Sequence, residues 1–274
     1  MGAFTSLLLL VCQLPGQSAP LTDVQAMLDA LPPGSYVSIP SGSYGRVVIH
    51  QPLTIVGADP APTFAEIALD GATGGRLSLA NLRTTSNLEG KGFDELRLFE
   101  IEVAAGRVRV NGLDYLELAH LTFTPIPFGD VEAPGASVML LDSAVGSLSG
   151  ARLYRSGSTC VQVAPTDFEK TLDNDLILAQ PVRVGGNLSL SWSLPGPVAV
   201  LLGRTRTQVP LHAPHSAAGY WHLAGSRWLT VTVVTPGSLS IQVPPAMELT
   251  GLQIAFQVMG PNRYLSRPAT AVVR

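Results

Sequence analysis

Charge, aromatic rings and cysteine are scarce in this chain of 274 residues. Charged residues make up 14% of the sequence and aromatic residues 6%, and the two cysteines are Cys12 and Cys160. Cys12 lies in an apolar N-terminal run of the kind that is cleaved from exported proteins. Its loss would leave Cys160 as a single thiol, so no intramolecular disulfide is expected. Stability must therefore come from packing and backbone pairing. A hydrophobic share of 46% excludes disorder.

Several functional motifs are absent from the sequence. There is no P-loop, dinucleotide fingerprint, nucleophile elbow or CxxC pair. The arginines are dispersed, which argues against nucleic-acid binding. No segment reaches the roughly 18 apolar residues of a membrane helix, so no membrane span is expected. Cys160 stands in a strand-like segment, where a buried apolar role is favoured over a nucleophile.

The first 19 residues resemble a secretory signal peptide. An apolar run over residues 7–12 is followed by small and polar residues up to Ala19. This layout predicts export, to the cell surface or the medium. The alternative is a buried first strand, and the site of any cleavage is left open.

The net charge of −3 conceals two oppositely charged halves. Residues 20–175 hold ten Lys/Arg against nineteen Asp/Glu, a net of −9, whereas residues 176–274 hold seven Arg and one Glu, a net of +6. This asymmetry indicates two domains with different surfaces. It also suggests that the two halves dock on each other.

A repeat of about twenty residues dominates the acidic half. Apolar or small residues recur at i, i+2 and i+5, in triplets that start 19, 20 and 32 residues apart. The triplets are Leu77, Leu79 and Leu82; Leu96, Leu98 and Ile101; Leu116, Leu118 and Leu121; and Leu148, Gly150 and Leu153. Strand-like segments at this period predict a coil stacked on itself. A leucine-rich horseshoe would need helical return segments, which the pattern lacks.

Two further segments complete the expected coil. Residues 22–31 predict a short amphipathic helix, with a capping box of Thr22 and Gln25, that covers the open end of the coil. The proline-rich residues 125–135 predict a loop that projects from one rung.

The opening of the coil resembles a known family. The runs are Thr22–Gly34, Tyr36–Tyr44 with Pro-Ser-Gly-Ser-Tyr, and Val47–Gly57 with Pro-Leu-Thr-Ile-Val-Gly. They are similar to the start of secreted bacterial right-handed β-helix proteins of the pectin-lyase-like class. The resemblance spans about residues 21–165 and implies the fold, while the class contains lyases, hydrolases, epimerases, adhesins and proteins of no known activity.

The basic half lacks the twenty-residue repeat of the acidic half. Short alternating segments separated by Pro and Gly predict a small antiparallel β-sandwich. The fold class is therefore all-β: a short right-handed parallel β-helix with an N-terminal capping helix, then the sandwich. The expected ranges are 1–19 signal peptide, 20–165 β-helix, 166–180 linker and 181–274 sandwich.

Stacking of the triplets predicts columns of polar side chains about 4.8 Å apart. One column reads Asn81, Glu100, His120 and Arg152, and the other reads Ser78, Arg97, Glu117 and Ser149. Glu100 and His120 form a possible general acid and base pair, and Glu117 is the third catalytic candidate. The favoured interpretation is structural, since neighbouring rungs pair opposite charges.

The basic half supplies the remaining candidates. His212, His215 and His222 have a spacing that could hold a metal, although no carboxylate or cysteine is near in sequence. Tyr220, Trp221 and Trp228 could form a platform for sugar rings, or could fill the core.

The sequence favours an exported, non-catalytic module that binds carbohydrate or builds part of the cell envelope. Its expected partner is a polysaccharide or another envelope component, without a cofactor. The alternative is a polysaccharide lyase or hydrolase that works in a groove of the β-helix. Calcium would enter only in the lyase case.

Overall fold

The computed structural model describes residues 23–72, 74–156, 158–163, 168–171, 176–178, 181–192, 198–210, 220–227, 232–233, 237–246, 249–259, 266 and 269–274. The signal segment predicted over residues 1–19, which includes Cys12, lies outside them. The described chain is all-β apart from one short helix. No described helix is long and apolar enough to cross a bilayer.

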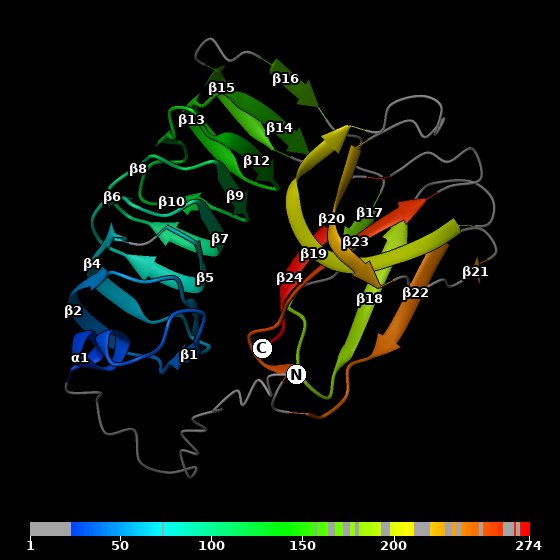
Figure 1. The fold of residues 1–274 in the computed structure, drawn as a ribbon, viewed down its shortest axis with the longest axis horizontal. Helices are drawn as coiled ribbons and strands as arrows, with labels where there is room; N and C mark the ends of the chain where they lie inside the picture. The colour runs from blue at the N-terminus through cyan, green and yellow to red at the C-terminus, as the bar shows by residue number, and fades with distance from the viewer. Residues whose placement is uncertain are drawn as a thin grey trace, which may run out of the picture.

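The acidic half forms a parallel β-solenoid of about six turns. In Figure 1 it climbs from blue to green beside the C-terminal sheets. One long face, called face 1, contains β2(Ser43–Ile49), β4(Thr63–Asp70), β6(Leu88–Lys91), β8(Arg107–Asn111), β11(Gly129–Glu132), β13(Ala144–Ser149) and β15(Thr159–Val163). The other, called face 2, contains β1(Tyr36–Ile39), β3(Thr54–Gly57), β5(Arg76–Thr84), β7(Glu95–Val103), β9(Tyr115–Ala119), β12(Ser137–Leu141), β14(Arg152–Ser156) and β16(Phe168–Thr171).

A narrow third strip joins the two faces. The ends of β5 and β7 bend into it, and β10(Thr122–Phe123) pairs with the end of β7. The start of β4 pairs with the end of β5 at Thr63 and Arg83. Each of these turns therefore runs from face 2 through the strip to face 1.

The triplet residues form the interior of the solenoid. Leu77, Leu96 and Leu116 stand in one register column, and Leu79, Leu98 and Leu118 in the next. All six are fully buried in one hydrophobic cluster that runs through the coil. The first three triplets are therefore confirmed, and Leu98 points into the solenoid.

The fourth triplet is wrong. Val138 and Leu140, rather than Leu148 and Gly150, follow Leu116 and Leu118 on face 2. Leu153 then pairs with Val138 one turn later. The long interval contains a complete turn whose inward residues are Val138 and Leu140, which the search for leucine triplets passed over.

The same register corrects the loop predicted over residues 125–135. Gly129–Glu132 is strand β11, paired with β8 and β13, and its Val131 is fully buried. The two ends of the range lie outside the strand: Ile126 and Phe128 are 45% and 40% exposed, and Pro134 and Gly135 form an exposed turn. The prolines at 125 and 127 exclude strand pairing there, but not after Gly129.

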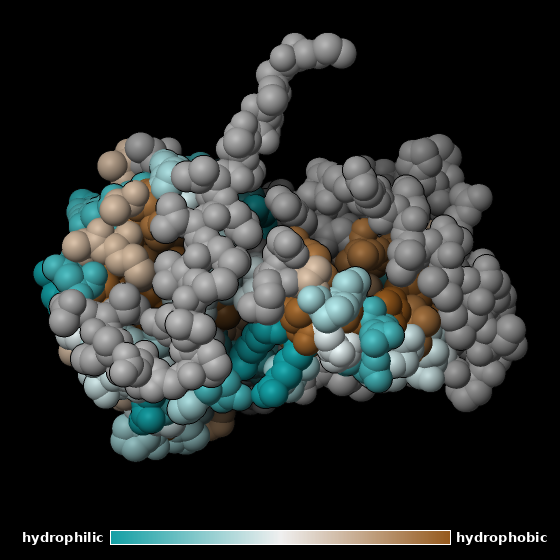
Figure 2. Space-filling model, turned by 90° about the horizontal axis from the view of Figure 1, so that it is seen from below, coloured by the Kyte–Doolittle hydropathy of each residue, from teal (hydrophilic) through white to brown (hydrophobic). Residues whose placement is uncertain are grey.

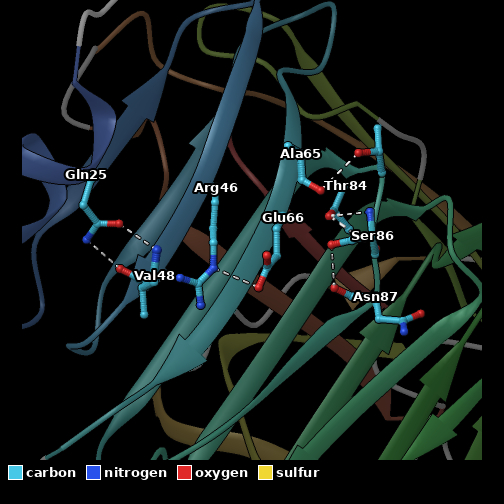
Figure 3. Close-up of polar contacts among 9 residues, drawn as sticks. Gln25, Arg46, Val48, Ala65, Glu66, Thr84, Ser86 and Asn87 are labelled. Atoms are coloured by element: carbon cyan, nitrogen blue, oxygen red, sulfur yellow. Dashed lines mark hydrogen bonds and ion pairs between the residues drawn. The ribbon is translucent and has the colours of Figure 1, made fainter.

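Helix α1(Val24–Asp29) lies against the first strand of face 1. Its N-cap is Asp23, whose Oδ1 accepts a hydrogen bond from the Ala26 amide at 2.9 Å, whereas Thr22 lies outside the described residues. Gln25 makes no capping box. Its side-chain amide instead donates to the Val48 carbonyl and accepts from the Val48 amide, at 2.9 and 2.7 Å (Figure 3). Gln25 thus satisfies backbone groups at the outer edge of β2.

The basic half contains two antiparallel sheets. The first is β17(Leu176–Leu178), β18(Asn187–Trp192) and β22(Gly237–Gln242), and the second is β19(Val198–Pro210), β20(Tyr220–Arg227), β21(Thr232–Val233), β23(Gln253–Met259) and β24(Ala269–Val272). Residues of both, such as Leu190 and Phe256, share one hydrophobic cluster. The last parallel strand of the solenoid is β16 and the first antiparallel strand is β17. Both lie within residues 166–180, so the range expected as a linker contains strands of both halves.

Replacement of Leu98 tests the stacking. Leu98→Asp places an unpaired charge in the solenoid interior, so we expect the free energy of unfolding in urea to fall by more than about 3 kcal/mol. Glu89→Ala, an exposed change on β6, should alter it by less than about 0.5 kcal/mol. Equal stability of the two variants would refute the assigned interior.

Replacement of Gln25 tests the contact between α1 and β2. Gln25→Ala leaves two backbone groups of Val48 without their partner, and should lower the unfolding free energy by about 1–2 kcal/mol. Asp29→Ala, on the same helix, removes only the exposed contact from the Gln25 amide at 2.9 Å and should have little effect. A similar loss in both variants would mean that the strand contact contributes nothing specific.

Candidate functional site

The first predicted column follows the corner at which face 2 ends. Asn81, Glu100 and His120 occupy equivalent places there with φ values of 52°, 52° and 55°. The next member is Asp142, with φ 45°, and not Arg152, which pairs with Ser137 on face 2. The column changes because an additional turn, with Val138 and Leu140 on β12, lies between the third triplet and Arg152.

The left-handed backbone explains three of the four residues at the corner, Asn81, His120 and Asp142, but not Glu100. Asn, Asp and His adopt positive φ more readily than most residues. The side chain of Asn81 also bridges to the previous turn, where it donates to the carbonyls of Gly57 and Ala58 at 3.1 and 2.7 Å. The corner column therefore has a structural use in at least one rung.

The second predicted column lies on the outer side of face 2. Ser78, Arg97 and Glu117 stand in register on consecutive strands, as expected, and Met139 follows. Ser149 is wrong for this column, because it pairs with Glu132 on face 1.

Arg97 and Glu117 are buried although they point away from the solenoid interior. Their side chains are 1% and 0% exposed, and Nη1 of Arg97 lies 3.8 Å from Oε2 of Glu117. Glu95 lies 3.1 Å from the same guanidinium, which sits 5.7 Å from the centre of the Tyr115 ring. These four residues, called the Arg97 cluster, form an outward-facing charged group. Arg97, Glu117 and Tyr115 are buried, whereas the Glu95 side chain at its edge is 32% exposed.

Burial raises the pKa of Tyr115 well above its usual value of 10.0. The nearby Glu117 carboxylate raises this pKa further and the Arg97 guanidinium opposes it. The phenol oxygen lies 3.5 Å from Oε2 of Glu117, which is long for a hydrogen bond. Tyr115 is therefore held in its neutral form.

Glu100 and His120 line a small pocket where the solenoid meets the end of the chain. Its other lining residues are Ala80, Phe99, Thr270, Ala271, Val272 and Arg274, and it encloses about 240 Å³, open solvent included. Small-molecule sites usually measure about 300–1,000 Å³. Glu117 does not line this pocket, so the three catalytic candidates do not converge on one space.

Arg274 forms an ion pair with the Glu100 carboxylate. Burial lowers the pKa of the Arg274 guanidinium, and the charge of Asp59 opposes that change. The carboxylate that could act on a substrate is thus engaged by a cation of the same chain. Sequence reasoning missed Arg274, because it lies 174 positions from Glu100 along the chain.

Further contacts link β24 and its neighbours to face 2. Val272 belongs to the same buried cluster as Val56, Ala80, Phe99, Ala119 and Leu141, the outward residues of consecutive turns. A Cβ on Gly251 would overlap the ring of Tyr36, so only glycine permits this approach. Arg183 lies 3.2 Å from Asp59. Figure 1 shows β24 on the side of the C-terminal sheets that faces the solenoid.

Face 1 carries a different kind of surface. Its outward residues pair across turns, as in Arg46 with Glu66 at 3.0 Å (Figure 3) and Arg109 with Glu132 at 3.0 Å. Ser147 donates to Asp130 at 2.6 Å. Opposite charges in neighbouring turns are what the structural interpretation of the columns expects. This face presents hydrogen-bonding groups on rigid strands.

The other predicted sites lie beyond what the structure describes. His212, His215 and Trp228 fall outside the described residues, and so do the side chains of Tyr220, Trp221, His222 and Cys160. Within the described ranges, no three His, Cys, Asp or Glu side chains lie close enough together to hold a metal ion.

Comparison with known proteins gives no relative: no protein-family model, curated protein or solved structure matches the chain. The function must therefore be argued from the site itself.

Replacement of Tyr115 tests its burial against Glu117. A raised pKa means that the folded state keeps the phenol proton which the unfolded chain loses, so stability falls as the pH rises above 10.0. Tyr115→Phe removes this loss. We expect the unfolding free energy of the variant, relative to wild type, to improve by about 1.4 kcal/mol per pH unit above 10.

The half-exposed Tyr44 provides the control. Burial raises the pKa of Tyr44 as well, but more modestly. Tyr44→Phe should show a smaller relative gain over the same pH range. Parallel pH profiles for wild type and Tyr115→Phe would show that the phenol is accessible to water in the native protein.

Proposed function

We propose that the protein is an exported, non-catalytic module of the cell surface or extracellular space that binds carbohydrate. In this proposal the solenoid is a right-handed β-helix of the pectin-lyase-like kind, α1 is its cap, and the two antiparallel sheets form a sandwich. The observation that carries the proposal is the engagement of both candidate carboxylates within the protein. Glu117 lies in the buried Arg97 cluster, and Glu100 pairs with Arg274.

Catalysis at this place would need a different arrangement. A general acid and base must reach one substrate atom, and a lyase or hydrolase needs both groups open to a sugar chain. Glu117 is fully buried, and the pocket beside Glu100 is smaller than usual small-molecule sites. These features favour binding over turnover.

Face 1 is the surface that we assign to the ligand. Its paired side chains offer donors and acceptors in fixed positions, which suits a chain of hydroxyl groups. Lys91 and Asn111 stand in one register column, beside Glu89 and Arg109 in the next. Because acids and bases alternate, the face favours a neutral polysaccharide over a strongly acidic one.

The opposite charges of the two halves have a second role in this proposal. The ion pairs of Arg274 with Glu100 and of Arg183 with Asp59 each join the basic half to the acidic half. We infer that the halves dock on each other through face 2. This docking leaves face 1 available.

Polysaccharide retention and product analysis test the function together. The intact protein is tested with laminarin, a neutral glucan, and with polygalacturonate, an acidic polymer. We expect laminarin to be retained without new reducing ends or unsaturated sugars. The double variant Lys91→Ala and Arg109→Ala should bind at least threefold more weakly, because it removes two of the exposed donors.

The control is Arg76→Ala, which changes a cation on face 2 and should leave laminarin binding unchanged. Product release that Glu117→Gln abolishes would establish an enzyme and overturn the proposal. Failure of the intact protein to retain either polysaccharide would also overturn it.

A further inference from the structure

We propose that the C-terminal sheets are a releasable cover over face 2, and that release exposes the Arg97 cluster as a second binding surface for neutral polysaccharide. The class of ligand rests on the proposed function, whereas the existence of the cover is argued independently of it. The cover consists of residues 269–274, Gly251 and Arg183, and the covered surface consists of the outward residues of face 2.

The two halves have separate hydrophobic cores. The cluster that fills the solenoid contains residues from Val24 to Leu153, and the cluster of the C-terminal sheets contains residues from Leu176 to Val273. The cluster that bridges them is small, with Val272 as its one buried contribution from the C-terminal side among the described residues. Separation of the halves would therefore leave both main cores intact. Interfaces of this kind within a chain commonly allow relative motion.

The ion pairs at the border are weak constraints. The side chains of Arg183 and Asp59 are 61% and 65% exposed, so salt and water screen their attraction. Figure 2, which looks at the molecule from below, shows hydrophilic residues near the border between the solenoid and the C-terminal sheets. Arg274 and Glu100 are less exposed, at 17% and 28%, and we assign them the larger share of the closing interaction.

The covered surface itself favours release. Arg97 and Glu117, at 1% and 0% exposure, lose hydration when the cover closes, and a buried ion pair seldom regains that cost in full. Permanent interfaces are mostly apolar. Face 2 instead places a charged group of four residues beside its apolar strip.

The exposed group has the chemistry of a saccharide site. The Arg97 guanidinium on β7 lies over one face of the Tyr115 ring on β9, 5.7 Å from its centre, which leaves the opposite ring face for a ligand, and Glu117 lies within reach of both. An aromatic face with adjacent charged hydrogen-bonding groups suits a sugar ring. Within the cluster the carboxylates of Glu95 and Glu117 outnumber the Arg97 guanidinium, so an acidic polymer would be repelled and a neutral chain favoured.

Thiol labelling of neighbouring residues on β9 tests the cover. Ala119 points outward beneath the cover and Leu118 points into the solenoid, and both are at most 1% exposed. Cysteine is introduced at each position, and labelling is counted above the background of the wild-type protein. A releasable cover predicts that Ala119→Cys reacts at least tenfold faster than Leu118→Cys under native conditions.

Removal of the ion pair between Arg274 and Glu100 should change the labelling rate at the outward position alone. Adding Arg274→Gln should accelerate labelling of Ala119→Cys at least threefold and leave Leu118→Cys unchanged. Ala80→Cys and Leu79→Cys on β5 form a second matched pair, should either β9 variant fail to fold. Equal protection of the outward and inward thiols, with or without Arg274, would overturn the cover.

The ligand is tested separately with laminarin. Arg274→Gln should raise laminarin retention at least threefold, and the addition of Arg97→Ala should return it to the wild-type level. Unchanged retention in a variant whose cover has opened by thiol labelling would overturn the second binding surface. That outcome would leave the proposed function intact, because the double variant Lys91→Ala and Arg109→Ala tests binding by face 1 separately.

Discussion

Parallel pairing between consecutive turns is the interaction on which the rest of this structure depends. Each turn contributes its backbone groups to the turns before and after it, so a residue is fixed in register with its equivalents. Leu79, Leu98 and Leu118 meet inside the coil for this reason, and Arg97 meets Glu117 outside it. Because alternate residues point to opposite sides of a strand, the same pairing builds both the core and the columns of polar side chains. The positions available for function are therefore set by register.

The two long faces have different relations to solvent. Face 1 carries charges that are paired between turns and largely exposed, such as Arg46 and Glu66. Face 2 carries the Arg97 cluster, which is buried, and an apolar strip that Val272 joins. Of the catalytic candidates, Glu117 belongs to the Arg97 cluster and Glu100 pairs with Arg274, so both carboxylates are engaged within the protein. This is why we favour a binding module over an enzyme.

The period and the first three triplets were predictable from the sequence, because Leu77, Leu96 and Leu116 share one residue type at nearly constant spacing. The next turn was not, because Val138 and Leu140 replace leucine and β11 follows a proline-rich segment. That error displaced two column members, so Asp142 and Met139 stand where Arg152 and Ser149 were expected. Helix α1 was predicted for its amphipathic pattern, but the bonds from Gln25 to Val48 needed the strand edge in three dimensions. The partner of Glu100 could not be found, since local patterns carry no information about Arg274.

The oppositely charged halves of the chain meet along face 2. A double-mutant cycle on Glu100→Gln and Arg274→Gln measures this contact most directly, because it isolates the energy that couples one residue of each half. The account predicts a coupling energy of about 1 kcal/mol in unfolding at low salt, and a smaller value at high salt, since the pair is partly exposed. Additive effects of the two substitutions, with no coupling at any salt concentration, would contradict it.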